Sequence, residues 1–142
     1  MTPAFWDTSA LVPLCVRQKP SPSVRRLIKQ YGIVVWWATS VEMRSAFERL
    51  LRMDQLSASE HAAAGLRLKR LRSGWREMQP SETLRSQAEI FLLRFPLKAA
   101  DALQLAAAWI WSSGTPQQCV FISSDAQLLE AAQKLEFQII SA

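Results

Sequence analysis

The stretch from Leu97 to Ala108 constrains the fold more than any other part of this sequence. It is rich in alanine and leucine, which favour helix, and its apolar residues cover nearly every face of that helix. Pro96 directly before it is typical of a helix start, because proline is tolerated only at or before the first turn. A helix that is apolar all round must be covered by other elements. The sequence therefore predicts a helix buried in the middle of the molecule.

Short apolar runs typical of buried strands alternate with helical patterns along the chain. The expected strands are residues 2–6, 33–37, 119–122 and 137–140, with residues 75–78 as a weaker candidate. The expected helices are residues 10–17, 24–31, 39–51, 57–71, 81–95, 97–111 and 128–135. Pro13 interrupts the first of these helices in or near its first turn. Continuous apolar strands separated by helices predict an α/β fold with a mainly parallel sheet.

Capping and glycine patterns indicate where several of these helices begin and end. Thr39 with Glu42, and Ser57 with Glu60, match the capping box, in which the two side chains satisfy each other's backbone N–H groups. Gly32 is expected to close the helix that precedes it.

Composition places the chain among ordinary globular proteins. Its 142 residues, 49% hydrophobic and 20% charged, predict a single domain over residues 1–142. No apolar run reaches the roughly 18 residues of a membrane span, and no amino-terminal targeting pattern is present. Cys15 and Cys119 are too few and too isolated for a disulfide framework or a zinc site, so we expect free thiols. A cytoplasmic protein without a membrane partner is expected, and the net charge of +5 permits an anionic partner.

Four acids from distant segments fall near the expected carboxyl ends of strands. Asp7 and Asp125 each follow a strand, and Glu42 and Asp101 lie in the first turn of a helix. Ligands of open α/β sheets bind at that edge, so the four side chains are expected to converge there. Without a cation they would repel one another. Carboxylate oxygens suit Mg²⁺ or Mn²⁺, and the pattern predicts a site for one of these ions.

Each acid also has a purely structural interpretation. Glu42 could be the far arm of the Thr39 capping box, and Asp7 and Asp125 could cap the helices that follow them. Asp101 is the hardest to explain in this way, because an otherwise apolar helix gives it little access to water. Their joint occurrence favours the metal site.

The residues around these acids resemble the motifs of the PIN-domain family, and within it the VapC-type toxins of VapBC toxin–antitoxin modules. The motifs that carry the resemblance are residues 5–12, 40–46, 97–106 and 121–128, of which the third is the most specific. The resemblance implies a three-layer α/β/α domain with a central four- to five-stranded, mainly parallel sheet. The metal-binding and catalytic residues that it implies are Asp7, Glu42, Asp101 and Asp125, with support from Thr8, Ser9 and Ser124.

The sequence departs from the family pattern at two positions. Gln104 stands where many relatives have histidine, and it is not expected to be catalytic. Glu136 stands where a glycine before the final aromatic residue is usual, which is expected to alter only a turn.

The resemblance implies a Mg²⁺- or Mn²⁺-dependent endoribonuclease, a hydrolase that cleaves RNA of the tRNA or rRNA class. The ions would orient and deprotonate water, so no separate general base is required. The only histidine, His61, is expected on the surface. A homodimer and a cognate VapB-like antitoxin are also implied, with the antitoxin tail in a groove lined by residues 10–16 and 43–53, including Phe47 and Leu50.

Other interpretations compete with this one. A PIN domain that only binds RNA or protein would have the same fold and no catalytic activity. The presence of all four acids disfavours this interpretation. A phosphoacceptor receiver domain is rejected for two reasons. Asp7 is followed by Thr8 rather than by a second acid, and the third acid of this chain, Asp101, lies inside a helix. A nuclease for structured DNA is disfavoured by the compact single domain. The basic residues Arg67, Lys69, Arg70, Arg72 and Arg76 could contact phosphates or form a solvated helix face.

Overall fold

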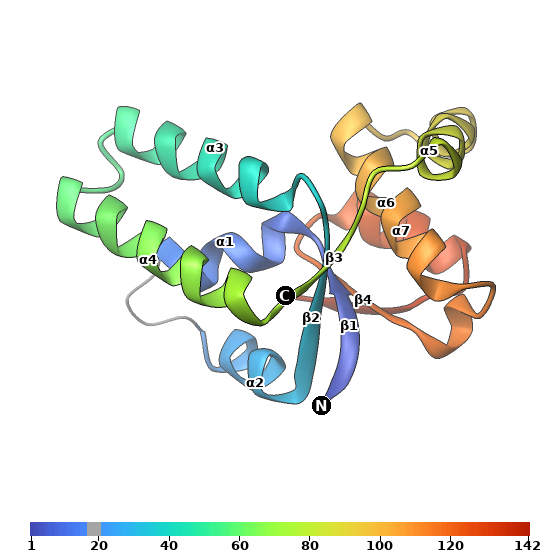
Figure 1. Ribbon diagram of the computed structural model, residues 1–142, viewed down its shortest axis with the longest axis horizontal. Helices are drawn as coiled ribbons and strands as arrows, with labels where there is room; N and C mark the ends of the chain where they lie inside the picture. The colour runs from blue at the N-terminus through green and yellow to red at the C-terminus, as the bar shows by residue number, and fades with distance from the viewer. Residues whose placement is uncertain (17–20) are drawn as a thin grey trace.

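The computed structural model describes residues 1–16 and 21–142, and its strands form one five-stranded parallel sheet (Figure 1). The strands are β1 (Thr2–Trp6), β2 (Tyr31–Trp36), β3 (Arg76–Met78), β4 (Val120–Ser123) and β5 (Gln138–Ser141). Their order is β3-β2-β1-β4-β5, so β1 is central and the direction of winding reverses between β1 and β4. The predicted α/β fold with a parallel sheet is confirmed.

Helices cover both faces of this sheet. They are α1 (Thr8–Val16), α2 (Pro22–Gln30), α3 (Thr39–Arg52), α4 (Ala58–Gly74), α5 (Glu82–Arg94), α6 (Ala99–Ser112) and α7 (Ala126–Lys134), with a 3₁₀ turn at Pro116–Gln118. Helices α1 to α4 pack in one hydrophobic cluster and α5 to α7 in another, on opposite sides of the strands (Figure 1). The three-layer arrangement predicted from the sequence is therefore present.

Successive side chains along a strand point alternately into the two hydrophobic clusters. In β1, Phe5 packs with the α5–α7 side, stacked on Phe121 of β4, whereas Ala4 and Trp6 pack with the α1–α4 side. All four side chains are fully buried. Because side chains alternate along a strand, only a strand covered on both faces can be apolar at consecutive positions.

The alanine-rich helix α6 is the buried helix that the sequence predicts. Residues 104–108 have no exposed surface, and the helix lies between β2 of the sheet and α5. Small alanine side chains allow this close approach on both sides. The single polar residue in that run is Gln104, which is therefore held in the protein interior.

Two of the predicted signals for helix ends are wrong. Helix α2 ends at Gln30, and Gly32 lies within β2 opposite Pro3 rather than closing a helix. Helix α3 has Ala38 at its N-cap and no side-chain cap, so the capping box predicted for Thr39 and Glu42 does not form. The oxygens of both side chains instead accept hydrogen bonds from Gln104 of α6, a tertiary contact that replaces the local one. The box at Ser57, by contrast, is confirmed.

Pro13 lies in the second turn of α1, which continues past it. Proline has no N–H, so the carbonyl of Ser9 lacks its usual helical donor. The hydroxyl of Ser124 donates to that carbonyl at 3.3 Å. Arg17, at the end of the predicted helix, lies outside the described residues.

Both cysteines are free, as predicted. Cys15 is buried in the α1–α4 cluster, and this desolvation raises the pKa of its thiol to about 11. Within the described residues, no helix combines the length and the apolar character that crossing a membrane requires.

Candidate functional site

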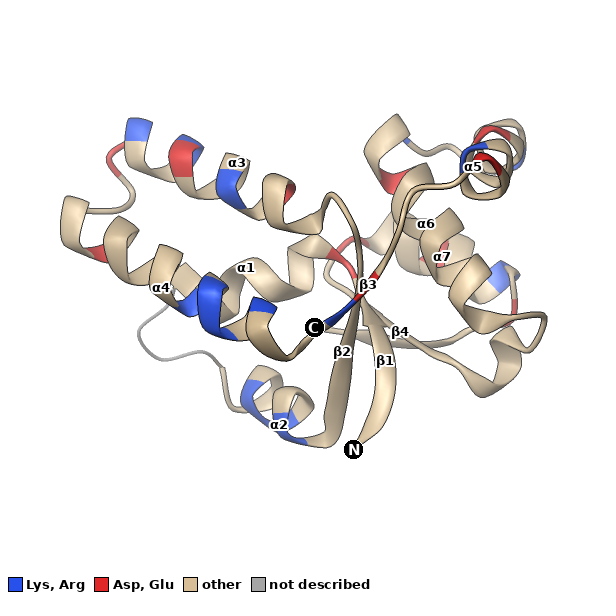
Figure 2. Ribbon diagram, in the orientation of Figure 1, with Lys and Arg blue, Asp and Glu red and all other residues tan. Residues whose placement is uncertain are grey.

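The four acids singled out in the sequence line one pocket of about 390 Å³ at the carboxyl edge of the sheet. Asp7 directly follows β1, and Asp125 follows β4 as the N-cap of α7. Glu42 and Asp101 lie in the first turns of α3 and α6, the two helices whose acidic ends lie above the strands in Figure 2. The pocket thus lies where β1 and β4 diverge, the usual ligand position in such a sheet.

Asp7 is the most deeply buried of the four, with 4% of its surface exposed. Its Oδ2 accepts hydrogen bonds from Ser9 Oγ at 2.5 Å and Ser123 Oγ at 2.9 Å, with a longer contact of 3.4 Å from the Ser9 N–H. Burial raises the pKa of Asp7, the hydrogen bonds from Ser9 and Ser123 lower it, and the charge of Asp125 raises it, with a net upward shift. No hydrogen bond from a described residue reaches Oδ1.

Serine hydroxyls join the turn after β1 to the turn after β4. Ser9 Oγ accepts from the N–H of Ser124, and Ser123 Oγ accepts from the N–H of Asp125, both at 2.9 Å. The sequence pattern did not indicate Ser123, whereas it did indicate Ser124, whose exposed hydroxyl contacts backbone carbonyls instead. The position of Ser123 at the end of a buried strand, next to Ser124, is the only sequence signal for it.

Glu42 is held through Oε1. Thr8 Oγ1 donates to this oxygen at 3.0 Å and Gln104 Nε2 at 3.2 Å. Burial raises the pKa of Glu42, these two hydrogen bonds lower it, and the charges of Asp7 and Asp101 raise it, with a net upward shift. As with Asp7, one carboxylate oxygen is occupied by protein donors and the other has no described donor.

Gln104 of α6 contacts the side chains of Thr8, Thr39 and Glu42. Its Nε2 lies 2.9 Å from Thr8 Oγ1 and 3.2 Å from Thr39 Oγ1, in addition to its bond to Glu42. Its Oε1 is buried and has no hydrogen-bond partner among the described residues. The glutamine therefore acts as a donor to Glu42 and to the hydroxyl that supports it.

Asp101 and Asp125 complete the acidic lining. Asp101 is only partly buried, so Asp7, and not Asp101, has the least access to water. Burial raises the pKa of Asp101, the charges of Asp125 and Asp7 raise it further, and Lys98 lowers it. Asp125 Oδ1 accepts from the N–H groups of Gln127 and Leu128 at 2.9 and 3.1 Å. Asp125 therefore caps α7 and lines the pocket at the same time.

The chemistry of this donor set fits Mg²⁺ or Mn²⁺, although the geometry is open. Four carboxylates surround one pocket, and three of them have raised pKa values, with repulsion from neighbouring acids among the causes. A divalent cation would relieve that repulsion. However, in residues 1–16 and 21–142 no three acidic, histidine or cysteine side chains lie close enough to hold one ion. Mg²⁺ is usually held by one or two carboxylates with waters completing its coordination, so this spacing is compatible with the ion.

The basic residues that the sequence indicated do not line this pocket. Arg76 lies in β3 rather than on a helix face, and Arg67 donates to the carbonyl of Cys15 at 2.6 Å. The pocket is instead lined by Arg49 of α3, which the sequence pattern did not indicate. Its separation of seven residues from Glu42, or two helical turns, is the signal that could have found it.

His61, expected on the surface, is partly exposed and does not line the pocket. Its Nε2 lies 2.6 Å from Glu48 Oε1, a contact that joins α4 to α3. One expectation about the groove needs correction. Phe47 is 1% exposed and belongs to the core, so it cannot line a groove. The groove between α1 and α3 is lined by Val12, Pro13 and Ala46, beside the acids.

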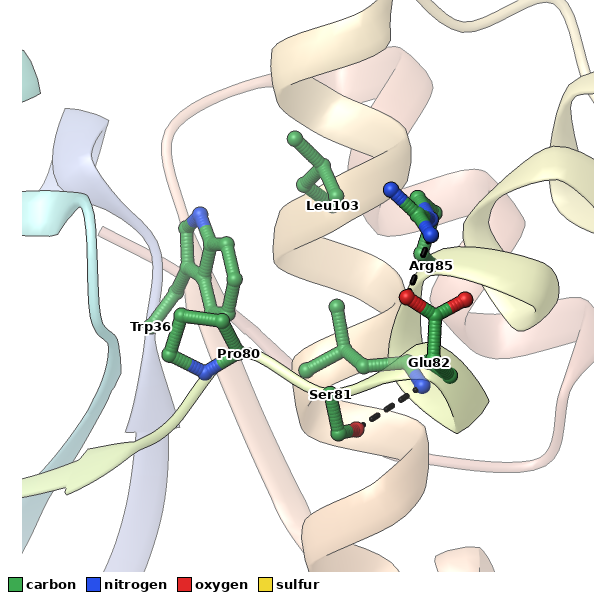
Figure 3. A pocket seen from close by; sticks show the side chains of 7 residues that line it. Trp36, Pro80, Ser81, Glu82, Arg85 and Leu103 are labelled. Carbon is green, nitrogen blue, oxygen red and sulfur yellow. Dashed lines mark hydrogen bonds and ion pairs between the residues drawn. The ribbon is translucent and has the colours of Figure 1, made fainter.

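A second pocket, of about 350 Å³, lies between the end of β2 and the starts of α5 and α6 (Figure 3). Trp36 and Pro80 form one side, Leu103 the upper part, and the paired Glu82 and Arg85 the other side. Glu82 is the one carboxylate among its described lining residues, and it is paired with that arginine, so this pocket offers no comparable cation site. The acidic pocket is the candidate functional site.

Comparison with solved structures shows several proteins of the same fold. A chain of a toxin–antitoxin complex from Klebsiella pneumoniae is 13% identical, with a TM-score of 0.66, covering 97% of this chain and 96% of that chain. PAE2754 from Pyrobaculum aerophilum is 20% identical, with a TM-score of 0.67 and coverages of 99% and 89%. FitAcB from Neisseria gonorrhoeae is 15% identical, with a TM-score of 0.68 and coverages of 97% and 96%.

No protein-family model and no curated protein matches this sequence significantly. The similarity to solved structures extends over nearly the whole chain, at identities that establish the fold alone. The PIN-like fold implied by the resemblance to VapC-type toxins is therefore confirmed.

Proposed function

We propose that this protein is a metal-dependent endoribonuclease toxin, a phosphodiester hydrolase whose activity is neutralised by a cognate antitoxin. The observation that carries the proposal is the convergence of Asp7, Glu42, Asp101 and Asp125 on one pocket at the switch point of the sheet. Acids from four separate segments, three with raised pKa values, are costly for stability and are typical of a catalytic site. The toxin–antitoxin complex among the structural neighbours supports the same assignment.

The four acids would hold Mg²⁺ or Mn²⁺, which when bound activates water and stabilises charge on the phosphate. The protein's own groups prepare the carboxylates for this role. Ser9 and Ser123 fix Oδ2 of Asp7. In the same way Thr8 and Gln104 fix Oε1 of Glu42. In both cases the second carboxylate oxygen is left for a cation.

The proposed substrate is RNA, on the basis of the net charge of the protein and the family resemblance. The carboxylates alone repel a polyanion, so productive binding of RNA requires the cation as well. The net charge of +5 favours association with nucleic acid. A tRNA or rRNA substrate is implied by the resemblance to VapC-type toxins.

The proposed partner is an antitoxin whose tail lies in the groove between α1 and α3, along Val12, Pro13 and Ala46. A homodimer is proposed on the resemblance. Co-purification of a small co-encoded protein should be lost in Val12→Glu and kept in Val41→Glu, a matched change on the exposed face of α3. Equal co-purification by both variants would place the antitoxin elsewhere.

The test of the proposed activity is cleavage of total RNA by purified, antitoxin-free protein with Mg²⁺ or Mn²⁺. Cleavage should be lost with EDTA and in Asp101→Asn, and it should persist in Glu82→Gln, which removes a carboxylate from the second pocket. Sequencing the ends of the products would then identify the target. Cleavage that resists EDTA, or that survives Asp101→Asn, would refute the proposed mechanism.

A second candidate is a PIN domain that binds RNA or protein without cleaving it. The open arrangement of the acids, with no three close enough for one ion in the described residues, is the observation that favours it. Absence of cleavage by well-folded protein across several RNA sources, together with retained RNA binding, would favour this second function.

A further inference from the structure

The acidic pocket contains one basic side chain among its described lining residues, Arg49 of α3. Arg49 follows Glu42 by two helical turns, so both side chains lie on the same face of α3. Ala46 lies between them, and its small side chain leaves that part of the pocket open opposite Val12 of α1. The pocket is thus acidic at one end and basic at the other.

The side chain of Arg49 makes no ion pair with a described residue. Its side chain is exposed, and no carboxylate of a described residue lies within 4 Å of it, although four acids line the same pocket. An arginine without an ion pair, beside so many carboxylates, is available to a ligand. Its planar guanidinium group suits a phosphate, to which it donates two parallel hydrogen bonds.

The charge of the pocket gives Arg49 a role at this position. Four carboxylates and one divalent ion leave a formal charge of −2, and the guanidinium of Arg49 reduces it to −1. Arg49 therefore lowers the repulsion that a phosphodiester meets as it approaches the acids. The rise of an α-helix places the Cα atoms of Glu42 and Arg49 about 10 Å apart, so the two ends of the pocket contact different parts of the RNA.

We propose that Arg49 binds a phosphate of the RNA backbone adjacent to the phosphate held at the four acids. This inference rests on the proposed function, which it deepens by naming a substrate-binding residue. Arg49 positions the strand along the groove between α1 and α3 and takes no part in holding the metal ion.

The test is binding of a fluorescently labelled single-stranded RNA in Ca²⁺, measured by anisotropy over a range of salt concentrations. All proteins keep the four acids, and Ca²⁺ replaces Mg²⁺ because its longer and less regular coordination supports binding without cleavage. Arg49→Ala is compared with Arg52→Ala, which removes the same charge from an exposed position of α3 outside the pocket. We expect Arg49→Ala to weaken binding about tenfold or more, because it removes hydrogen bonds to a charged group. Its log–log salt slope should fall by about 0.7, the value for one phosphate of a single strand.

Two further measurements separate phosphate binding from a structural role. Mn²⁺ affinity, measured by electron paramagnetic resonance, should be unchanged or stronger in Arg49→Ala, because a cation has been removed from an acidic pocket. Arg49→Lys should restore most of the salt slope. Equal RNA affinities and slopes for Arg49→Ala and Arg52→Ala would overturn the inference, as would a loss of Mn²⁺ binding in Arg49→Ala. If none of the proteins binds RNA, including the one with both arginines, the proposed function fails, and this inference fails with it.

Discussion

Ser123→Ala offers a sharp test of how the protein holds its most buried acid. The hydroxyl of Ser123 is fully buried, donates to Asp7 Oδ2 at 2.9 Å and accepts from the N–H of Asp125 at the same distance. A hydrogen bond to a charged group contributes about 1.5–3 kcal/mol and a neutral one about 1 kcal/mol. We therefore expect Ser123→Ala to lower the free energy of unfolding by about 2–4 kcal/mol at pH 8, since water cannot replace a fully buried donor.

The expected loss depends on pH in a defined direction. The hydrogen bond from Ser123 lowers the pKa of Asp7, so it stabilises the ionised carboxylate more than the protonated form. As the pH falls through the raised pKa of Asp7, the carboxyl group becomes neutral and the loss should shrink toward that of a neutral hydrogen bond. Ser123→Ala should therefore be less destabilising at pH 4 than at pH 8.

Urea denaturation at both pH values measures this effect. Ser124→Ala is the matched control, because its exposed hydroxyl makes only contacts of 3.3 Å to backbone carbonyls. In the Asp7→Asn background the cost of Ser123→Ala should fall by about 1 kcal/mol or more, as a double-mutant cycle requires for residues in contact. Equal losses in Ser123→Ala and Ser124→Ala at pH 8 would refute the reasoning.

Three further predictions concern stability. The pKa values of Asp7, Glu42 and Asp101 are all raised, so the folded protein binds more protons than the unfolded chain above about pH 4. Without metal, the urea midpoint should therefore fall as the pH rises through those raised values, and a rising midpoint would contradict it. For the same reason Asp7→Asn should stabilise the metal-free protein at pH 7 by on the order of 1 kcal/mol while abolishing cleavage, which urea denaturation and the RNA assay would test. Glu136 has φ of +77°, in the left-handed region, so Glu136→Gly should raise the free energy of unfolding by about 1 kcal/mol; a lower melting temperature would refute this.

The sequence predicts the fold well because the determining patterns are local and repeated. Phe5 and Phe121 lie in short apolar runs that only a doubly covered parallel strand accommodates, and the alanine-rich helix α6 requires burial on both sides. One prediction failed because a contact distant in sequence replaced a local one. Thr39 matches a capping box, yet its hydroxyl accepts from Gln104, which lies 65 residues further along the chain.

The candidate site can be predicted only in part from the sequence. The four acids are recognisable because each follows a strand or begins a helix, which places them at one edge of the sheet. The roles of Ser123 and Gln104 depend on side-chain contacts that arise only when β1, β4, α3 and α6 are assembled. Arg49 follows Glu42 by seven residues on the same face of α3. Its place in the pocket also depends on α1, which forms the opposite wall.

The central claim is that the four acids form one cation site, and Mn²⁺ binding to the purified protein tests it most directly. Electron paramagnetic resonance of free Mn²⁺ would be followed during titration of the unmodified protein, Asp7→Asn, Asp101→Asn and the control Glu82→Gln. We expect binding that weakens at least tenfold in both aspartate variants and is unchanged in the control. Equal Mn²⁺ affinity in all four proteins, or no binding to the unmodified protein at millimolar Mn²⁺, would contradict the claim.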